Sequence, residues 1–152
     1  MSEPTIQNLF DLTGRVALIT GGSGFLGRSF SRALAEAGAS VVIASRAQDR
    51  AEQIAGDLPS PAGAQHFGVQ LDQLDEASLN AGFDAAVEAA GKVDILINNG
   101  QQGHPLDLTD VTGDAFSEDL KNVTGYFLLA RRFHDHIVDR DASGAVVMIG
   151  SM

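Results

Sequence analysis

A glycine-rich stretch with a fixed spacing is the feature of this sequence best suited to chemistry. It carries the pattern G-x-G-x-x-G at Gly22, Gly24 and Gly27, directly after an apolar run and at the start of an amphipathic one. Glycine admits left-handed turn angles and lets the backbone approach a pyrophosphate, whose charge the unpaired N–H groups at a helix start can meet. We therefore predict a phosphate-binding loop that holds a dinucleotide. The alternative is a turn that only packs a helix against a strand.

A cation stands about 20 residues beyond this loop, where a site for NAD usually places an acidic residue that holds the ribose hydroxyls. Ser45 and Arg46 occupy that place. Near the start of a helix a cation is disfavoured unless an anion compensates it, and a guanidinium offers phosphate a planar fork of donors. We therefore predict that Ser45 and Arg46 bind the cofactor and that NADP(H) is preferred over NAD(H). The alternative is a solvated Arg46 that pairs with Asp49.

Short apolar runs predict the strands that position these residues. Four runs are near-continuous and rich in β-branched residues, as in parallel strands covered on both faces, and a weaker fifth lies between the second and third of them. In chain order they are Val16–Ile19, Val41–Ala44, His66–Leu71, Val93–Ile97 and Ala145–Ile149.

Between the strands the apolar period changes to that of helices. Apolar faces run over 26–37 and 79–90, where Gly38 and Gly91 stand at expected C-terminal caps, and further helices are expected over 47–58 and 114–139. Strands that alternate with helices pair in parallel through right-handed crossovers. The sequence thus predicts a doubly wound α/β sheet, Rossmann-like, within a single domain over 1–152.

Composition excludes several classes of protein. Ten Lys and Arg against 20 Asp and Glu leave a net charge of −10, which disfavours binding to nucleic acid or to an anionic membrane. No apolar stretch approaches the length of a spanning helix, the sequence has no cysteine, and no metal site is expected. The first ten residues lack a targeting pattern, so we expect a cytoplasmic protein.

Four motifs resemble those of the short-chain dehydrogenase/reductase family. They occur in the family's order and together span nearly the whole chain. They resemble the family's opening strand and loop, its fourth strand with the Asn-Asn-Ala-Gly motif, the segment with its active-site Asn, and the fifth strand leading to its active-site Ser. The matching segments are 12–21, 93–100, 120–125 and 144–151. The resemblance implies hydride transfer between a nicotinamide cofactor and an alcohol or ketone, on a sheet of strand order 3-2-1-4-5.

The resemblance also implies roles for individual residues. Asp72 is expected against the adenine, and Asn98 and Gly100 along the adenosine-side ribose. Asn122 is expected to hold a proton-relay water and Ser151 to polarise the substrate oxygen, although Asn122 could instead bond a carbonyl inside its helix and Ser151 could be a turn residue. The phosphates and the remaining ribose are expected on Gly21, Ser23, Gly24, Phe25, Leu26 and Gly27.

Three departures from the family pattern bear on these expectations, and one is that Asn98-Asn99-Gly100-Gln101 lacks the usual Ala. The middle glycine of the loop comes one residue early, so that Phe25 stands in its usual place. More seriously, the family's general acid is a Tyr with a Lys four residues later. The only tyrosine is Tyr126 and the only lysines are Lys92 and Lys121, so these 152 residues contain no such pair. We expect this chain alone to be catalytically incomplete, with the family's last strands missing.

Incompleteness leaves a second interpretation open. The apolar run 145–149 would form an open sheet edge without a charge or proline to deter association. The chain could therefore be a non-catalytic dinucleotide-binding module that self-associates or is completed by a second chain. The long helix over 114–139 is the expected surface of a homo-oligomer.

Overall fold

Five parallel strands form one sheet in the order β3-β2-β1-β4-β5, which confirms the predicted fold and strand order. The computed structural model describes residues 3, 5–103 and 106–150. The strands are β1 (Val16–Thr20), β2 (Ser40–Ser45), β3 (His66–Gln70), β4 (Ile95–Asn98) and β5 (Ala145–Met148).

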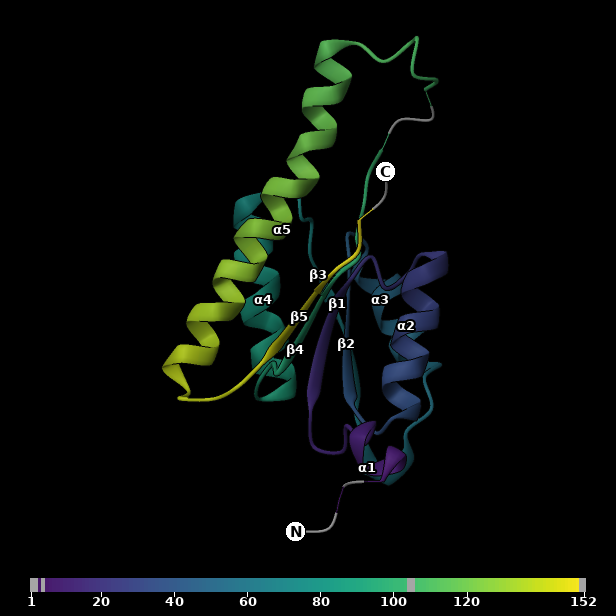
Figure 1. Cartoon of the computed structure of the whole chain (residues 1–152), viewed down its shortest axis with the longest axis vertical. Coiled ribbons are helices and arrows are strands. Elements are labelled where there is room, and N and C mark those ends of the chain that lie inside the picture. The colour runs from purple at the N-terminus through teal and green to yellow at the C-terminus, as the bar shows by residue number, and fades with distance from the viewer. Residues whose placement is uncertain (1–2, 4, 104–105, 151–152) are drawn as a thin grey trace.

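Helices cover both faces of the sheet, with α2 and α3 on one face and α4 and α5 on the other (Figure 1). Each lies where the apolar period predicts it. They are α2 (Phe25–Glu36), α3 (Gln48–Gly56), α4 (Glu76–Ala90) and α5 (Gly113–Asp139). Gly91 ends α4 with a φ of 79°, and Gly38 follows α2 with a φ of 95°, as expected of C-terminal caps.

Two short elements have no apolar period that could predict them. The single turn α1 (Ile6–Leu9) is held by a capping box between Thr5 and Asn8. A 3₁₀ turn over Pro61–Gly63 begins with a proline, whose ring fixes φ for a helical start. Both depend on local hydrogen bonds or ring geometry rather than on burial.

The two cores explain why the strands are apolar at successive positions. Leu18 packs with Phe83 of α4 and Leu129 of α5, whereas the next residue, Ile19, packs with Ala35 of α2 and Ile54 of α3. Side chains alternate between the faces of a strand, so a strand covered on both sides needs apolar residues throughout.

The carboxyl ends of β1 and β4 lie side by side, because Ile19 is in register with Ile97. The chain leaves β1 toward β2 on one side, while β4 lies on the other side, and in such sheets ligands bind where the connections diverge. The hydroxyl of Thr20 accepts hydrogen bonds from Asn99 N at 3.0 Å and Gly100 N at 2.9 Å. This bridging fixes the two loops that follow these strands.

One edge of the molecule is apolar and uncovered. All four residues of β5 are exposed, including Val146 and Val147. The N-terminal part of α5 extends beyond the carboxyl edge of the sheet (Figure 1), and Phe116 and Phe127 on it are more than half exposed. Within the described part of the chain, no helix has both the length and the apolar character that crossing a membrane requires.

A buried carboxylate joins the opposite, amino edge of the sheet to the end of α5. Asp94 is 2% exposed and accepts hydrogen bonds from Val16 N and from the Arg140 guanidinium, each at 3.0 Å. It also pairs with Lys92 at 3.0 Å. Burial raises the pKa of Asp94, but the hydrogen bonds from Lys92, Arg140 and Val16 outweigh burial and hold the pKa below its ordinary value.

Candidate nucleotide-binding site

The loop after β1 is built so that only glycine fits at two of its positions. Gly21 has a φ of +62°, and a Cβ there would lie 2.6 Å from Gly100 Cα. A Cβ at Gly27 would lie 2.2 Å from the carbonyl oxygen of Gly21. The loop therefore turns tightly against both the β4 loop and the first turn of α2.

The first turn of α2 presents backbone donors at this loop. Gly24 is the N-cap and gives no side-chain cap, so the N–H groups of Phe25, Leu26 and Gly27 begin the helix without an intrahelical acceptor. The Phe25 side chain is 90% exposed. Phe25 stands where the family has a glycine, but it keeps the backbone N–H donor, and its side chain does not pack in the core.

A cavity of about 640 Å³ opens between these loops at the carboxyl edge of the sheet. That volume is in the range of small-molecule and cofactor sites. Ten of the eleven residues expected to bind the cofactor line it, and they come from the loops after β1, β2, β3 and β4. They are Gly21, Ser23, Gly24, Phe25, Leu26, Gly27, Ser45, Arg46, Asp72 and Gly100.

Asn98 is the expected residue that does not line the cavity. It is fully buried, and its amide nitrogen donates to the Tyr126 carbonyl oxygen at 3.1 Å. The next residue, Asn99, lines the cavity, with its amide donating to Thr20 O at 3.1 Å. Adjacent residues at a strand end point to opposite sides, and sequence alone did not show which asparagine faces the ligand.

Arg46 is bound to a neutral partner. Its Nη1 donates to Gln102 Oε1 at 2.9 Å, so the contact bridges the loops after β2 and β4, and it does not pair with Asp49. A second guanidinium, Arg50 of α3, lines the same cavity and donates to Ser23 O at 3.2 Å. The cavity therefore combines helix-start donors with two cations.

Asn122 lies beside the cavity rather than in its wall, and every polar atom of its side chain is engaged. Its Oδ1 accepts from Gln73 Nε2 at 2.9 Å and from Gln102 N at 3.0 Å. Its Nδ2 donates to the carbonyl oxygens of Gln102 at 2.6 Å and Asp119 at 3.0 Å. Gln73 also donates to the Gly100 carbonyl oxygen, so one amide joins α5 to the loop after β4.

The remaining expected catalytic residue, Ser151, lies outside the described residues. The only tyrosine, Tyr126, donates its hydroxyl to the Ile149 carbonyl oxygen at 3.3 Å. Burial raises the pKa of Tyr126, so its hydroxyl stays protonated at neutral pH. In this position Tyr126 ties α5 to the end of β5.

Besides Asn99, the residues Arg50, Gln73 and Gln102 of the site were not predicted from the sequence. Arg50 is four residues after Arg46, and a surface helix commonly carries an arginine, so nothing in its spacing distinguished it. Gln73 and Gln102 are in loops, where the amide partners depend on the folded geometry. Among the described residues, no group of three or more metal-ligating side chains comes together.

The fold is that of an α/β protein, and its cavity has the features of a dinucleotide site. These features are a tight glycine loop, N–H donors at a helix start and two arginines, all of which suit a phosphorylated ligand. Comparison with known families agrees, because the family model described as short chain dehydrogenase matches residues 15–152. The chain belongs to the short-chain dehydrogenase family.

Its relatives are named for different substrates. The chain is 30% identical to a 3-oxoacyl-[acyl-carrier-protein] reductase of Aquifex aeolicus, over 93% of this chain and 57% of that protein. It is 28% identical to an L-rhamnose 1-dehydrogenase (NADP(+)) of Thermoplasma acidophilum, over 95% of this chain and 57% of that protein. The chain thus spans little more than half the length of these relatives.

Solved structures show the same fold. A short-chain type dehydrogenase/reductase from Mycobacterium marinum superposes with a TM-score of 0.88 at 29% identity, covering 98% of this chain and 60% of that one. A 3-ketoacyl-(acyl-carrier-protein) reductase from Brucella melitensis, solved with NADH, gives a TM-score of 0.79 at 33% identity, covering 92% and 58%.

Proposed function

We propose that this chain binds NADP(H) in preference to NAD(H), as part of an oxidoreductase that transfers a hydride between a nicotinamide and an alcohol or ketone carbon. The observation that carries the proposal is the shared cavity of the glycine loop and Arg46. The loop and the α2 donors suit the pyrophosphate, and Arg46 suits the 2′-phosphate that distinguishes NADP(H).

The residues of this chain would bind and orient the cofactor, which supplies the hydride chemistry when bound. Asp72 is proposed near the adenine and Gly100 near the adenosine-side ribose. Asn122 is proposed to hold a proton-relay water, for which its side chain would have to release one of the four hydrogen bonds that it makes in this structure. Ser151 would polarise the substrate oxygen.

The test of cofactor preference is titration of NADPH and NADH into the chain and into Arg46→Ala. Loss of one charged hydrogen-bonding partner should weaken NADPH binding about tenfold and leave NADH binding nearly unchanged. As a matched control, Gln102→Ala removes only the neutral partner of Arg46 and should preserve the ratio of the two affinities. Equal affinities for both cofactors, unaffected by Arg46→Ala, would refute the preference.

Turnover is the second test. Without a Tyr-x-x-x-Lys pair, the isolated 152 residues should bind NADPH but not oxidise it in the presence of ketones. Absorbance of the reduced nicotinamide measures this directly. Robust reduction of a ketone by this chain would contradict the proposal and would require another proton donor.

The uncovered edge favours a second candidate, a dinucleotide-binding module that self-associates or is completed by a second chain. All of β5 is exposed, and an unpaired apolar edge strand is a template for association. This candidate predicts nucleotide binding without turnover together with an oligomer. A monomer at micromolar concentration would contradict the self-associating form.

A further inference from the structure

Arg50 is a second cation at the cavity, in addition to Arg46, which the sequence predicted there. It lies on the first part of α3, and its Nη2 reaches the Ser23 carbonyl oxygen of the glycine loop at 3.2 Å. Arg46, four residues earlier, reaches Gln102 from the same connection between β2 and α3. Both residues line the one cavity, Arg46 in contact with the loop after β4 and Arg50 in contact with the glycine loop.

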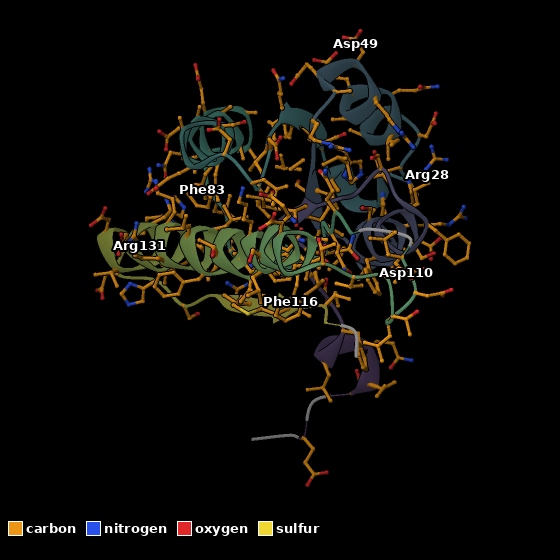
Figure 2. The ribbon with its side chains drawn as sticks, turned by 90° about the horizontal axis from the view of Figure 1, so that it is seen from above. Arg28, Asp49, Phe83, Asp110, Phe116 and Arg131 are labelled. Carbon is orange, nitrogen blue, oxygen red and sulfur yellow. The ribbon has the colours of Figure 1, made fainter. Side chains whose placement is uncertain are left out.

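Neither guanidinium is neutralised by the protein. Among the ion pairs of the described residues, none includes Arg46 or Arg50, and the acceptors that they contact are uncharged oxygens. Asp49 is exposed on α3, on the side of the molecule away from α4 and α5 (Figure 2). Asp72 lines the cavity, but its Oδ1 accepts from Leu74 N at 3.0 Å.

Two unpaired cations in one cavity are unusual in a chain of net charge −10, and an anion between them would stabilise both. The pyrophosphate has its own donors at the start of α2. The anion left to satisfy Arg46 and Arg50 is a phosphomonoester beside the β2 loop, which in a dinucleotide is the 2′-phosphate.

We infer that Arg50 is a second specificity-determining residue, which clamps the 2′-phosphate of NADP(H) together with Arg46. This inference rests on the proposed dinucleotide binding and extends it. The neutral contacts of Arg46 with Gln102 and of Arg50 with Ser23 hold the guanidiniums at the cavity wall until the phosphate replaces them. A purely structural Arg50 would instead tie α3 to the glycine loop and serve every dinucleotide equally.

The experiment compares four ligands, NADPH, NADH, 2′,5′-ADP and 5′-AMP, on the wild-type chain, Arg50→Ala and Arg50→Lys. Arg50→Ala should weaken NADPH and 2′,5′-ADP about tenfold while NADH and 5′-AMP change less than about twofold. Arg50→Lys should restore part of the affinity for the two 2′-phosphorylated ligands, because it keeps the charge but not the fork.

Arg15→Ala is the matched control, because it removes the same charge from an exposed site before β1, at the amino edge of the sheet. It should leave all four affinities unchanged. An equal loss of NADPH and NADH binding in Arg50→Ala, or no loss of NADPH binding, would refute the role of Arg50 in binding the 2′-phosphate and leave the proposed dinucleotide binding standing. Failure of the wild-type chain to bind any dinucleotide would overturn the proposed function and the clamp with it.

Discussion

Single residues of the nucleotide loop have unequal roles although the same residue type recurs. Gly27 lies against the Gly21 carbonyl, where a Cβ would be 2.2 Å from the oxygen, whereas a Cβ at Gly24 would meet that oxygen at 3.3 Å. Gly24 also has a φ of −80°, which any residue adopts. Of these two glycines of the motif, Gly27 is therefore sterically required and Gly24 tolerates a side chain.

Gly27→Ala should destabilise the chain by about 1–3 kcal/mol and abolish measurable dinucleotide binding, because the added methyl forces the loop away from α2. Gly24→Ala should change the free energy of unfolding by less than about 1 kcal/mol and keep binding. Urea unfolding and NADPH titration measure the two effects. Similar losses in both variants would show that the steric distinction is wrong.

At the scale of elements, the C-terminal end of α5 is coupled to β4 by a neutral histidine. His136 Nε2 accepts the Val93 N–H at 3.1 Å and faces Arg140 Nη1 at 3.2 Å, and its ring packs edge-on against Phe83. Figure 2 shows Phe83 on α4, on the same side of the molecule as α5. Burial lowers the pKa of His136, and the charges of Arg140 and Arg132 lower it further. The charges of Asp94 and Asp139 raise it, but the pKa stays below its ordinary value.

A lowered pKa in the folded state means that the unfolded chain binds the proton more readily. The stabilisation is therefore complete above about pH 6.5 and is lost as the pH falls through and below that value. His136→Gln keeps an acceptor for Val93 but does not titrate, so it should reduce the fall in urea midpoint between about pH 7.5 and pH 5.5.

His134→Gln is the control for this measurement, because His134 is exposed two residues earlier on α5. It should keep the wild-type dependence of the midpoint on pH. A His136→Gln variant with an unchanged pH dependence would show that protonation of His136 does not destabilise the junction of α5 and β4.

At the scale of the whole molecule, the distribution of apolar surface is asymmetric. Phe116, Leu120, Val123 and Phe127 recur at helical spacing on α5, and each is between 49% and 64% exposed. Beside them β5 leaves its edge open. Contiguous exposed apolar surface of this kind marks an interface, which here is proposed as a contact between copies of the chain.

Phe127→Glu should shift the chain toward monomer, because it places a charge within the exposed apolar surface of α5 and removes the contact of its ring with Arg131. Sedimentation at several micromolar concentrations measures the shift. Leu108→Glu offers a matched control, since Leu108 is 93% exposed in the loop before α5. An unchanged sedimentation coefficient in Phe127→Glu would place the contact elsewhere, and a wild-type monomer would remove the proposal.

Local sequence pattern predicted the five strands, the four long helices and the glycine loop after β1. Apolar period distinguishes strands buried on both faces from one-sided helices, and the glycine pattern predicts a turn that needs no side chain. These features depend on residues close together in the chain. The strands and the glycine loop could therefore be predicted from local pattern, whereas the strand order was implied by the family resemblance and is confirmed by the sheet. Ten of the eleven residues expected to bind the cofactor line one cavity, and their contact with a cofactor stays a prediction.

Contacts between segments distant in the chain could be learned only from the folded structure. In the structure Asn99 rather than Asn98 lines the cavity, Arg46 donates to Gln102, and Arg50 donates to the glycine loop. The fold also places Gln73 between Gly100 and Asn122. A side-chain hydrogen bond depends on the position of its partner within a few tenths of an ångström, and local spacing does not encode that position.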